Sequence, residues 1–372
     1  MEKIIYVTGS FPRLGDGIGD AAGKLYDSMI KEENILLITS DILNIREYIE
    51  EKKYKDVLLV SNWRLKAVRQ ILKQMKKEGS TKLLIEYAGN GYKKDLAISF
   101  LPFFIRVRNL FCKKKIKCHL RLHEYTMCRK ARKIFTWPLV RFCHHLDTPS
   151  FVEYEHLKNK FGNKVSKSGI GSNINWVNSK KMPSEGKINL GFFGGIYPGK
   201  GIEKLLEIWS ELEHNYPERY QYYLLGGFPK NLTNAFNNYQ SEIQKLIEEK
   251  GLASKIIITG FLPEEEIEQK LDLIDIAVLP YEDGLTLRRG SFLAFLGRNV
   301  AVVTTSGDTE AQELFKNADG VKMCANEKEM IEAILDYSEN EKYYHAGLNN
   351  NQFQKCFDWD KIAKQVLSIF QY

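Results

Sequence analysis

The chain has 372 residues, 44% of them apolar, and a formal net charge of +7. That length exceeds one ordinary hydrophobic core and favours two domains of roughly 150 to 200 residues. No uncharged run approaches the roughly 20 residues that cross a bilayer, and no signal-peptide pattern follows Met1, so we expect a cytoplasmic protein. The six cysteines include no C-x-x-C pair, which argues against a zinc site and a disulfide framework.

Apolar runs typical of strands alternate with helical patterns. The predicted strands lie at 4–9, 34–40, 56–62, 82–88, 117–125, 187–195, 220–227, 255–260, 274–280 and 300–305. Among the helices, a basic one is expected over 64–77, and another carries one apolar stripe, formed by Ile202, Leu205, Leu206, Trp209 and Leu212. This alternation predicts an α/β protein with parallel sheets covered by helices on both faces.

A polar segment divides the pattern into two halves. It spans 178–187 and contains Pro183, so we interpret it as a linker between an N-terminal domain, 1–177, and a C-terminal domain, 188–355. Open parallel sheets bind ligands beyond the carboxyl ends of their strands. The loops that follow the predicted strands are therefore the places to search for a site.

The loop after the first strand contains Gly15, Gly17 and Gly19. A helix expected from about Asp20 directs its free N–H groups toward this loop, and a helix N-terminus attracts anions. The spacing is not G-x-G-x-x-G, and no acidic residue ends the second strand, so we expect no dinucleotide cofactor. The alternative is that these glycines serve only a tight turn.

A second loop follows the strand at 187–195. It combines Gly194 and Gly195 with Lys200, which stands just before the next helix, and Gly201, which allows a close backbone approach. A helix N-terminus and an ammonium together form an anion site. The loop lacks the GK[ST] ending of a P-loop, so ATP hydrolysis is not implied.

A third loop places Arg288 and Arg289 where a helix begins, beside the glycine and serine at 290 and 291. Positive charges are unfavourable at that end of a helix unless an anion joins them. We therefore predict that Lys200 and the two arginines converge on one anion, a diphosphate. The alternative is that both arginines are surface charges.

Basic residues are concentrated between 106 and 133, where eleven Lys and Arg stand against one acidic residue, Glu124. An apolar, aromatic segment, 98–111, overlaps the start of this window. Basic residues interleaved with Phe fit an anionic membrane surface. The alternative is a solvated helical face; we expect no nucleic-acid partner.

Taken in order, seven segments resemble retaining GT-B glycosyltransferases of family 4, many of which build bacterial capsules, exopolysaccharides and other surface polysaccharides. They are 15–25, 121–125, 170–174, 194–209, 258–284, 288–305 and 357–370. The resemblance implies two Rossmann-like domains facing each other across a cleft that holds the active site. It also implies that a C-terminal helix, 356–372, crosses back to the N-terminal domain.

The resemblance assigns roles to single residues. Lys200 matches the lysine that neutralises the diphosphate of a nucleotide-sugar donor, with Gly194, Gly195, Gly290 and Ser291 in the same binding loops. His123 matches the histidine near the donor sugar. Gly17 and Gly19 match the loop that faces phosphate and acceptor, and Asp20 follows it. These transferases commonly need no metal, because positive side chains and helix ends stabilise the leaving phosphate.

The chain also departs from the family pattern. Many members have an arginine at the position of Gly195, and a pair of glutamates at the positions of Thr286 and Ala294. We expect Arg288 and Arg289 to replace that arginine, and Glu282 or Asp283 to take over contacts with the donor sugar.

His123 ends a predicted strand, where a histidine can also merely hydrogen-bond a loop. As a catalytic residue it would position donor hydroxyls rather than act as a nucleophile, and Glu124 is the alternative base. The sequence thus predicts a retaining glycosyltransferase, without cofactor or metal, that moves a sugar to a lipid-linked saccharide while bound peripherally to the inner face of the cell membrane. Two alternatives remain open: a GT-B epimerase or phosphorylase, and a non-catalytic binder of anionic surfaces.

Overall fold

The computed structural model describes residues 2–12, 17–92, 95–126, 128–180, 186–228 and 234–371. The chain forms two compact units, the first made of Met1–Gly171 with Phe357–Tyr372 and the second of Ser172–Cys356. Residues 172–177, predicted to belong to the N-terminal domain, belong to the second unit, where the Val177 N–H donates to the Gly297 carbonyl at 2.9 Å. Of the predicted linker, residues 181–185 lie outside the described ranges.

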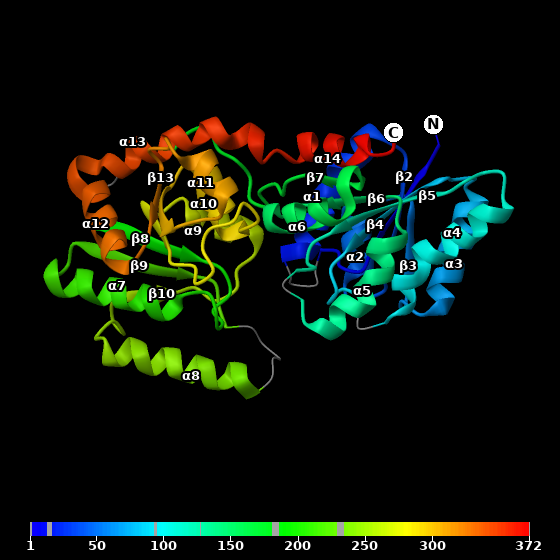
Figure 1. The fold of residues 1–372 in the computed structure, drawn as a ribbon. Helices are drawn as coiled ribbons and strands as arrows, with labels where there is room; N and C mark the ends of the chain where they lie inside the picture. The colour runs from blue at the N-terminus through cyan, green and yellow to red at the C-terminus, as the bar shows by residue number, and fades with distance from the viewer. Residues whose placement is uncertain are drawn as a thin grey trace. The chain divides into compact units, whose positions relative to one another are not determined.

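The first unit contains a seven-stranded sheet in the order β3-β2-β1-β4-β5-β6-β7 (Figure 1). All neighbouring strands pair in parallel. The strands are β1 (Ile4–Thr8), β2 (Ile35–Ser40), β3 (Val57–Val60), β4 (Lys82–Tyr87), β5 (Lys117–Leu122), β6 (His145–Thr148) and β7 (Val165–Lys167). The helices are α1 (Gly17–Glu32), α2 (Ile45–Glu51), α3 (Leu65–Lys77), α4 (Leu101–Phe111), α5 (Lys130–Phe142), α6 (Phe151–Phe161) and α14 (Trp359–Ser368).

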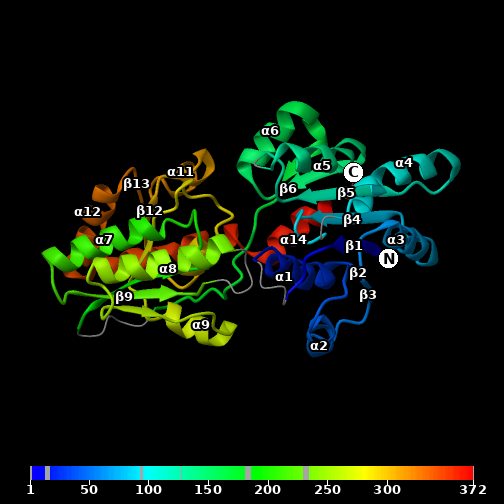
Figure 2. The same cartoon turned by 90° about the horizontal axis from the view of Figure 1, so that it is seen from below.

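Both faces of this sheet are buried, as expected for parallel strands between helices. In β1, Ile5 and Val7 pack into a cluster with residues of α3, α4 and α5, while Ile4 and Tyr6 pack into the opposite cluster with α1 and α14. Figure 2 shows α14 close to α1, and the Lys31 ammonium lies 2.8 Å from an Asp360 carboxylate oxygen. The predicted return of the C-terminal helix to the N-terminal unit is therefore confirmed.

The second unit contains a six-stranded parallel sheet in the order β10-β9-β8-β11-β12-β13. Its strands are β8 (Ile188–Phe193), β9 (Tyr220–Leu225), β10 (Ile256–Ile258), β11 (Ile276–Leu279), β12 (Ala301–Thr305) and β13 (Val321–Cys324). Its helices are α7 (Ile202–Asn215), α8 (Asn234–Glu249), α9 (Glu264–Leu271), α10 (Gly290–Gly297), α11 (Thr309–Phe315), α12 (Glu327–Ser338) and α13 (Lys342–Leu348). The predicted apolar stripe of α7 is buried in full. The predicted fold class, two parallel α/β domains, is confirmed.

Three strands escaped prediction: β6, β7 and β13. All are short, and β6 and β7 are rich in polar residues. In β6 this composition has a structural cause, because Asp147 is buried in a network of polar contacts.

Candidate active site

In the second unit the chain reverses its direction across the sheet between β8 and β11. From β8 it continues to β9 and β10 on one side, and from β11 to β12 and β13 on the other. Ligands bind at such a switch point, outside the carboxyl ends of the two strands. The loops there are 194–201 and 280–289, the second and third loops that the sequence analysis singled out.

Glycines allow the backbones of neighbouring loops to approach closely at this edge of the sheet. Gly201 has φ +76°, and a Cβ atom there would lie 1.9 Å from the Pro280 carbonyl oxygen. Gly194 has φ +138°, and a Cβ at Gly226, in the loop after β9, would lie 2.1 Å from the Gly194 carbonyl oxygen. Both positions need the left-handed backbone that glycine adopts readily. The close fit places the start of α7 against the end of β11.

Lys200 stands two residues before the start of α7, with its ammonium over the Tyr197 ring at 4.8 Å from the ring centre. No described residue forms an ion pair with this ammonium. The next lysine along, Lys204, behaves differently, because it pairs with Glu327 at 3.0 Å. Lys200 thus presents a positive charge beside a helix N-terminus, as the sequence predicted.

Arg289 is the residue directly before α10, which confirms the predicted start of that helix. Its guanidinium pairs with Asp283, approaches the Gly284 carbonyl at 3.4 Å and stacks over the Tyr281 ring at 4.4 Å. Its Nε is buried and has no hydrogen-bond partner among the described residues. The anion beside Arg289 in this structure is therefore Asp283.

Other predicted residues lie in the same two loops or at the start of α10. Ser291 shares a hydrogen bond of 2.7 Å with the Tyr281 hydroxyl, whose pKa is raised to about 12, chiefly by burial. A Glu282 carboxylate oxygen would lie 3.9 Å from a Cβ placed at Gly199, so Glu282 approaches the loop that carries Lys200. Arg288 and Gly195 are half-buried and Gly290 is exposed.

In the first unit, α1 begins at Gly17, three residues before the predicted start at Asp20. Gly19 is buried, whereas Gly17 and Asp20 are exposed, and a Cβ at Gly17 would meet nothing within 4 Å. Gly15 lies outside the described residues. Among the described residues, the start of α1 is thus open on the side of Gly17.

His123 directly follows β5, and its backbone N–H donates to the Tyr87 carbonyl at 3.2 Å. Its ring Nε2 lies 2.6 Å from Oε1 of Glu86, the penultimate residue of β4. The other carboxylate oxygen of Glu86 accepts a hydrogen bond from the Tyr6 hydroxyl. Burial alone would raise the pKa of Glu86, but the hydrogen bond from His123 and the charges of His123 and Arg121 outweigh it, so this pKa lies below its ordinary value.

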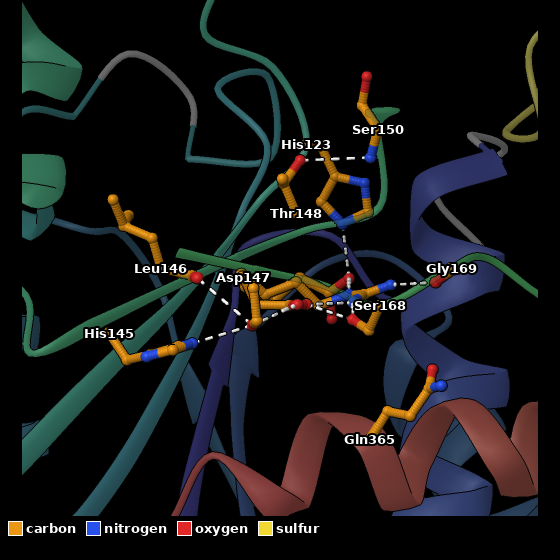
Figure 3. A network of polar contacts seen from close by, with 12 residues as sticks. His123, His145, Leu146, Asp147, Thr148, Ser150, Ser168, Gly169 and Gln365 are labelled. Carbon is orange, nitrogen blue, oxygen red and sulfur yellow. Dashed lines mark hydrogen bonds and ion pairs between the residues drawn. The ribbon is translucent and has the colours of Figure 1, made fainter. Parts of the chain in front are cut away.

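A buried ion pair lies beside this carboxylate. Arg121 Nη1 lies 2.5 Å from Asp147 Oδ2, Arg121 also binds the Ser168 hydroxyl, and its Nη2 donates to the Gly169 carbonyl at 2.8 Å. Figure 3 shows Asp147 and Ser168 at the centre of this network, with His145 on one side and Gly169 on the other. The Arg121 Nε lies 3.6 Å from Glu86 Oε1, which links the pair to His123.

Glu124, the predicted alternative base, lies outside this network. Its side chain is 45% exposed and lies 3.8 Å from Arg132. The loop that follows is instead held by the buried Glu153, which accepts hydrogen bonds of 2.8 Å from the backbone N–H groups of Tyr125 and Thr126.

Sequence reasoning missed Glu86, Tyr6, Arg121 and Asp147. The available signal was a charged residue in an apolar strand, as in "KLLIEY" and "KCHLRL".

All six cysteines are free thiols. Within the described ranges no three His, Cys, Asp or Glu side chains gather as a metal site, and no helix is long and apolar enough to span a membrane.

Known proteins share this architecture. The chain resembles sucrose-phosphate synthase from Thermosynechococcus elongatus (TM-score 0.73, 13% identity, covering 100% of this chain and 98% of that one). It also resembles HepE from Anabaena in complex with UDP-glucose (0.70, 15%, 99% of both chains) and the lipopolysaccharide outer core galactosyltransferase WaaB (0.67, 10%, 99% of both). No curated protein matches it in sequence.

A family model gives the sequence-level finding. Residues 175–352 match the family described as glycosyl transferases group 1. This match covers nearly the whole second unit, including both switch-point loops. The chain therefore has the GT-B fold, and its second unit is similar to the group 1 glycosyl transferases.

Proposed function

We propose that the chain transfers a sugar, with retention of configuration, from a nucleoside-diphosphate sugar to a saccharide acceptor. The observation that carries this proposal is the switch point of the second unit, where Lys200 and Arg289 stand at the starts of two helices. A diphosphate brings the negative charge that this arrangement favours. The complex of HepE with UDP-glucose supports a donor of this class.

In the proposed reaction the bond between the anomeric carbon and the donor phosphate oxygen breaks. The bond from the same carbon to the acceptor hydroxyl oxygen forms on the same face of the sugar. The departing phosphate oxygen takes the acceptor proton, so the step needs no protein base. Lys200 and the N–H groups that start α7 and α10 stabilise the charge of the leaving diphosphate, a role that requires no metal.

Two further groups act on the substrates in this proposal. The His123 ring positions hydroxyl groups of the donor sugar, whereas the half-exposed Glu124 is not needed as a base. The open start of α1, with Gly17, Gly19 and Asp20, receives the acceptor. Glu282 approaches the donor from the loop after β11.

We further propose that the acceptor is lipid-linked and that the protein works on the cytoplasmic face of the membrane, in the synthesis of a capsule or another surface polysaccharide. Its support is an apolar surface on α4 and α5, which pack together. Phe142 of α5 lies 5.1 Å from the Phe103 ring and 5.9 Å from the Trp137 ring, which joins the two helices into one aromatic ridge.

This α4–α5 surface is strongly exposed: Leu110 by 76%, Phe111 by 83% and Ile134 by 68%. Three exposed lysines, Lys113, Lys114 and Lys115, follow directly after α4. Apolar side chains next to lysines suit an anionic phospholipid surface. The apolar side chains enter the headgroup region, and the negative charge of the lipids attracts the lysines.

A donor screen tests the reaction. The protein is first heated with UDP, GDP, dTDP and their sugars, since a ligand at 100 times its dissociation constant stabilises by about 2.7 kcal/mol. The stabilising sugar nucleotide is then incubated with a lipid-linked saccharide extract, with and without EDTA. We expect an acceptor-dependent release of nucleoside diphosphate that survives EDTA and yields a product with the donor's anomeric configuration.

Other outcomes contradict specific parts of the proposal. Turnover without an acceptor would indicate an epimerase, and turnover that requires inorganic phosphate would indicate a phosphorylase. Inversion of the anomeric centre would contradict retention, and loss of activity in EDTA that Mg²⁺ restores would contradict the metal-free reaction. Salt-sensitive binding to anionic surfaces with no turnover would favour a non-catalytic binder.

A further inference from the structure

Glu86 is a buried carboxylate that the proposed reaction does not use. It lies on β4 opposite Arg121 of β5 and is only 2% exposed. Its two oxygens have different partners, because Oε1 lies 2.6 Å from His123 Nε2 and Oε2 accepts from the Tyr6 hydroxyl. One oxygen therefore contacts His123 and the other contacts the buried Tyr6 hydroxyl.

The charge of this carboxylate determines the form of the histidine ring. Although burial opposes ionisation, the contacts with His123 and Arg121 keep the pKa of Glu86 below its ordinary value. An ionised carboxylate can only accept hydrogen bonds, so the ring nitrogen that faces it carries a proton. The ring is thus held with hydrogen on Nε2, and Nδ1 is the nitrogen on the side away from Glu86.

The ion pair behind Glu86 fixes the carboxylate itself. Arg121 is 1% exposed and anchored by Asp147, by Ser168 and by the Gly169 carbonyl at 2.8 Å. The parallel register of β4 and β5, together with the bond of 3.2 Å from the His123 N–H to the Tyr87 carbonyl, fixes the backbone on both sides. Glu86 cannot turn away from His123 without also breaking its buried contacts with Tyr6 and Arg121.

We propose that Glu86 is a positioning residue for the transfer reaction: it orients the His123 ring through Nε2–H, and Arg121 with Asp147 holds Glu86 in place. This inference rests on the proposed function, in which His123 acts on the donor sugar. The ring is then held in one fixed direction when it acts on the donor sugar. The contribution of Glu86 is to the rate of the reaction rather than to donor binding.

Two substitutions separate this role from a structural one, because one removes the charge of the carboxylate and the other removes only its contact with Tyr6. Glu86→Gln replaces the acceptor of Nε2–H by a neutral amide, whereas Tyr6→Phe removes only the hydrogen bond to the other oxygen. We expect kcat to fall more than tenfold in Glu86→Gln with the donor KM changed less than about twofold, and to fall less than about threefold in Tyr6→Phe. The acid side of the kcat–pH profile changes only in Glu86→Gln.

A second readout needs no turnover. In protein labelled with ¹⁵N in its histidine rings, His123 of the wild type should give an Nε2–H signal that exchanges slowly with water, assigned by its loss in His123→Gln. The signal should persist in Tyr6→Phe and vanish or shift in Glu86→Gln. If Glu86→Gln does not fold, the wild-type spectrum still decides, because a proton on Nδ1 alone would overturn the proposal.

The outcomes distinguish this inference from the proposed function. If His123→Gln abolishes transfer but Glu86→Gln keeps the wild-type kcat and pH profile, the positioning role is refuted and the transferase stands. Equal losses in Glu86→Gln and Tyr6→Phe would show a structural carboxylate. If no sugar nucleotide is turned over by the wild type, the proposed function fails, and the ring signal alone still tests the contact.

Discussion

The charged residues of the two candidate sites are held in different ways. In the first unit, Glu86 is 2% exposed and Arg121 and Asp147 are 1% exposed, and each has a partner of opposite charge. In the second unit, the Asp283 side chain is 66% exposed, Arg289 is 17% exposed, and Lys200 rests on an aromatic ring. The charges of the first set are buried and neutralise one another. The charges of the second set are partly exposed, and the protein neutralises them only in part.

This difference has a physical meaning. Burying a charge costs several kcal/mol, and a partner of opposite charge offsets this cost only when the geometry of the pair is fixed. The buried set of the first unit is therefore rigid, and removing one of its members should strongly destabilise it. A site for an anionic ligand needs the reverse: cations whose charge the protein does not fully neutralise before binding. This contrast is what we expect if the first set of charges positions a side chain and the second set binds a diphosphate.

The largest expected effect comes from removing the cation of the buried set. Arg121→Ala leaves two buried carboxylates without their cation and should lower the free energy of unfolding of the first unit by about 3–5 kcal/mol. The matched control is Arg46→Ala, which breaks an exposed pair with Asp41 at 2.8 Å and should cost less than about 1 kcal/mol. Urea unfolding with separate probes in the two units measures both values, and similar costs for the two arginines would contradict the comparison.

The surface of the first unit offers a second test. Changing Lys113, Lys114 and Lys115 to Glu should weaken binding to anionic vesicles by about a hundredfold, because each lysine contributes about 1 kcal/mol. The control changes three other exposed lysines of the same unit, Lys52, Lys53 and Lys55, with the same change of charge. Vesicle sedimentation compares the two proteins, and equal binding would identify the basic window as an ordinary solvated face.

Acid should destabilise the first unit through its buried histidines. Burial is the main cause that lowers the pKa of His119 from 6.5 to about 3, and the nearby His145 and His144 add to the effect. Burial also lowers the pKa of His144, to about 4. Below pH 6.5 the unfolded chain binds protons that these folded side chains do not, so protons favour unfolding. Between pH 7 and pH 5, His119 alone should remove about 2 kcal/mol of stability.

His119→Leu tests this pH dependence. The ring of His119 is buried and stacks on Phe370 at 4.3 Å, a site that accepts an apolar side chain. We expect urea midpoints of the first unit to depend less on pH in this variant than in the wild type. An unchanged pH dependence would show that His119 does not cause the loss of stability.

The smallest expected effect concerns Asp283. Removing its charge with Asp283→Asn releases Arg289, so a nucleoside diphosphate should bind about two- to fivefold more tightly, the scale of a partly exposed ion pair. Calorimetric titration measures the change. Weaker binding of the free diphosphate would mean that Asp283 supports the phosphate site rather than competing with the ligand.

The sequence contained the second unit's site more fully than the first unit's. Lys200 and Arg289 stand in loops that follow strongly apolar strands and contain glycines, so strand order and the helix dipole were enough to propose them as site residues. Glu86 gave no comparable signal, because its partner His123 is distant in the sequence and the two meet only through the pairing of β4 with β5. The strand β6 was missed for a related reason, since Asp147 belongs to a network that only the folded sheet assembles.

Calorimetric titration of UDP, GDP and dTDP into three proteins tests the central claim, that the second unit binds a nucleoside diphosphate at its switch-point loops. The proteins are the wild type, Lys200→Ala and the control Lys204→Ala, whose lysine lies in the first turns of α7 and pairs with Glu327 at 3.0 Å. We predict that at least one nucleotide binds the wild type and Lys204→Ala alike, and binds Lys200→Ala more than tenfold more weakly. Binding that is equal in all three proteins, or absent from the wild type, would contradict the account.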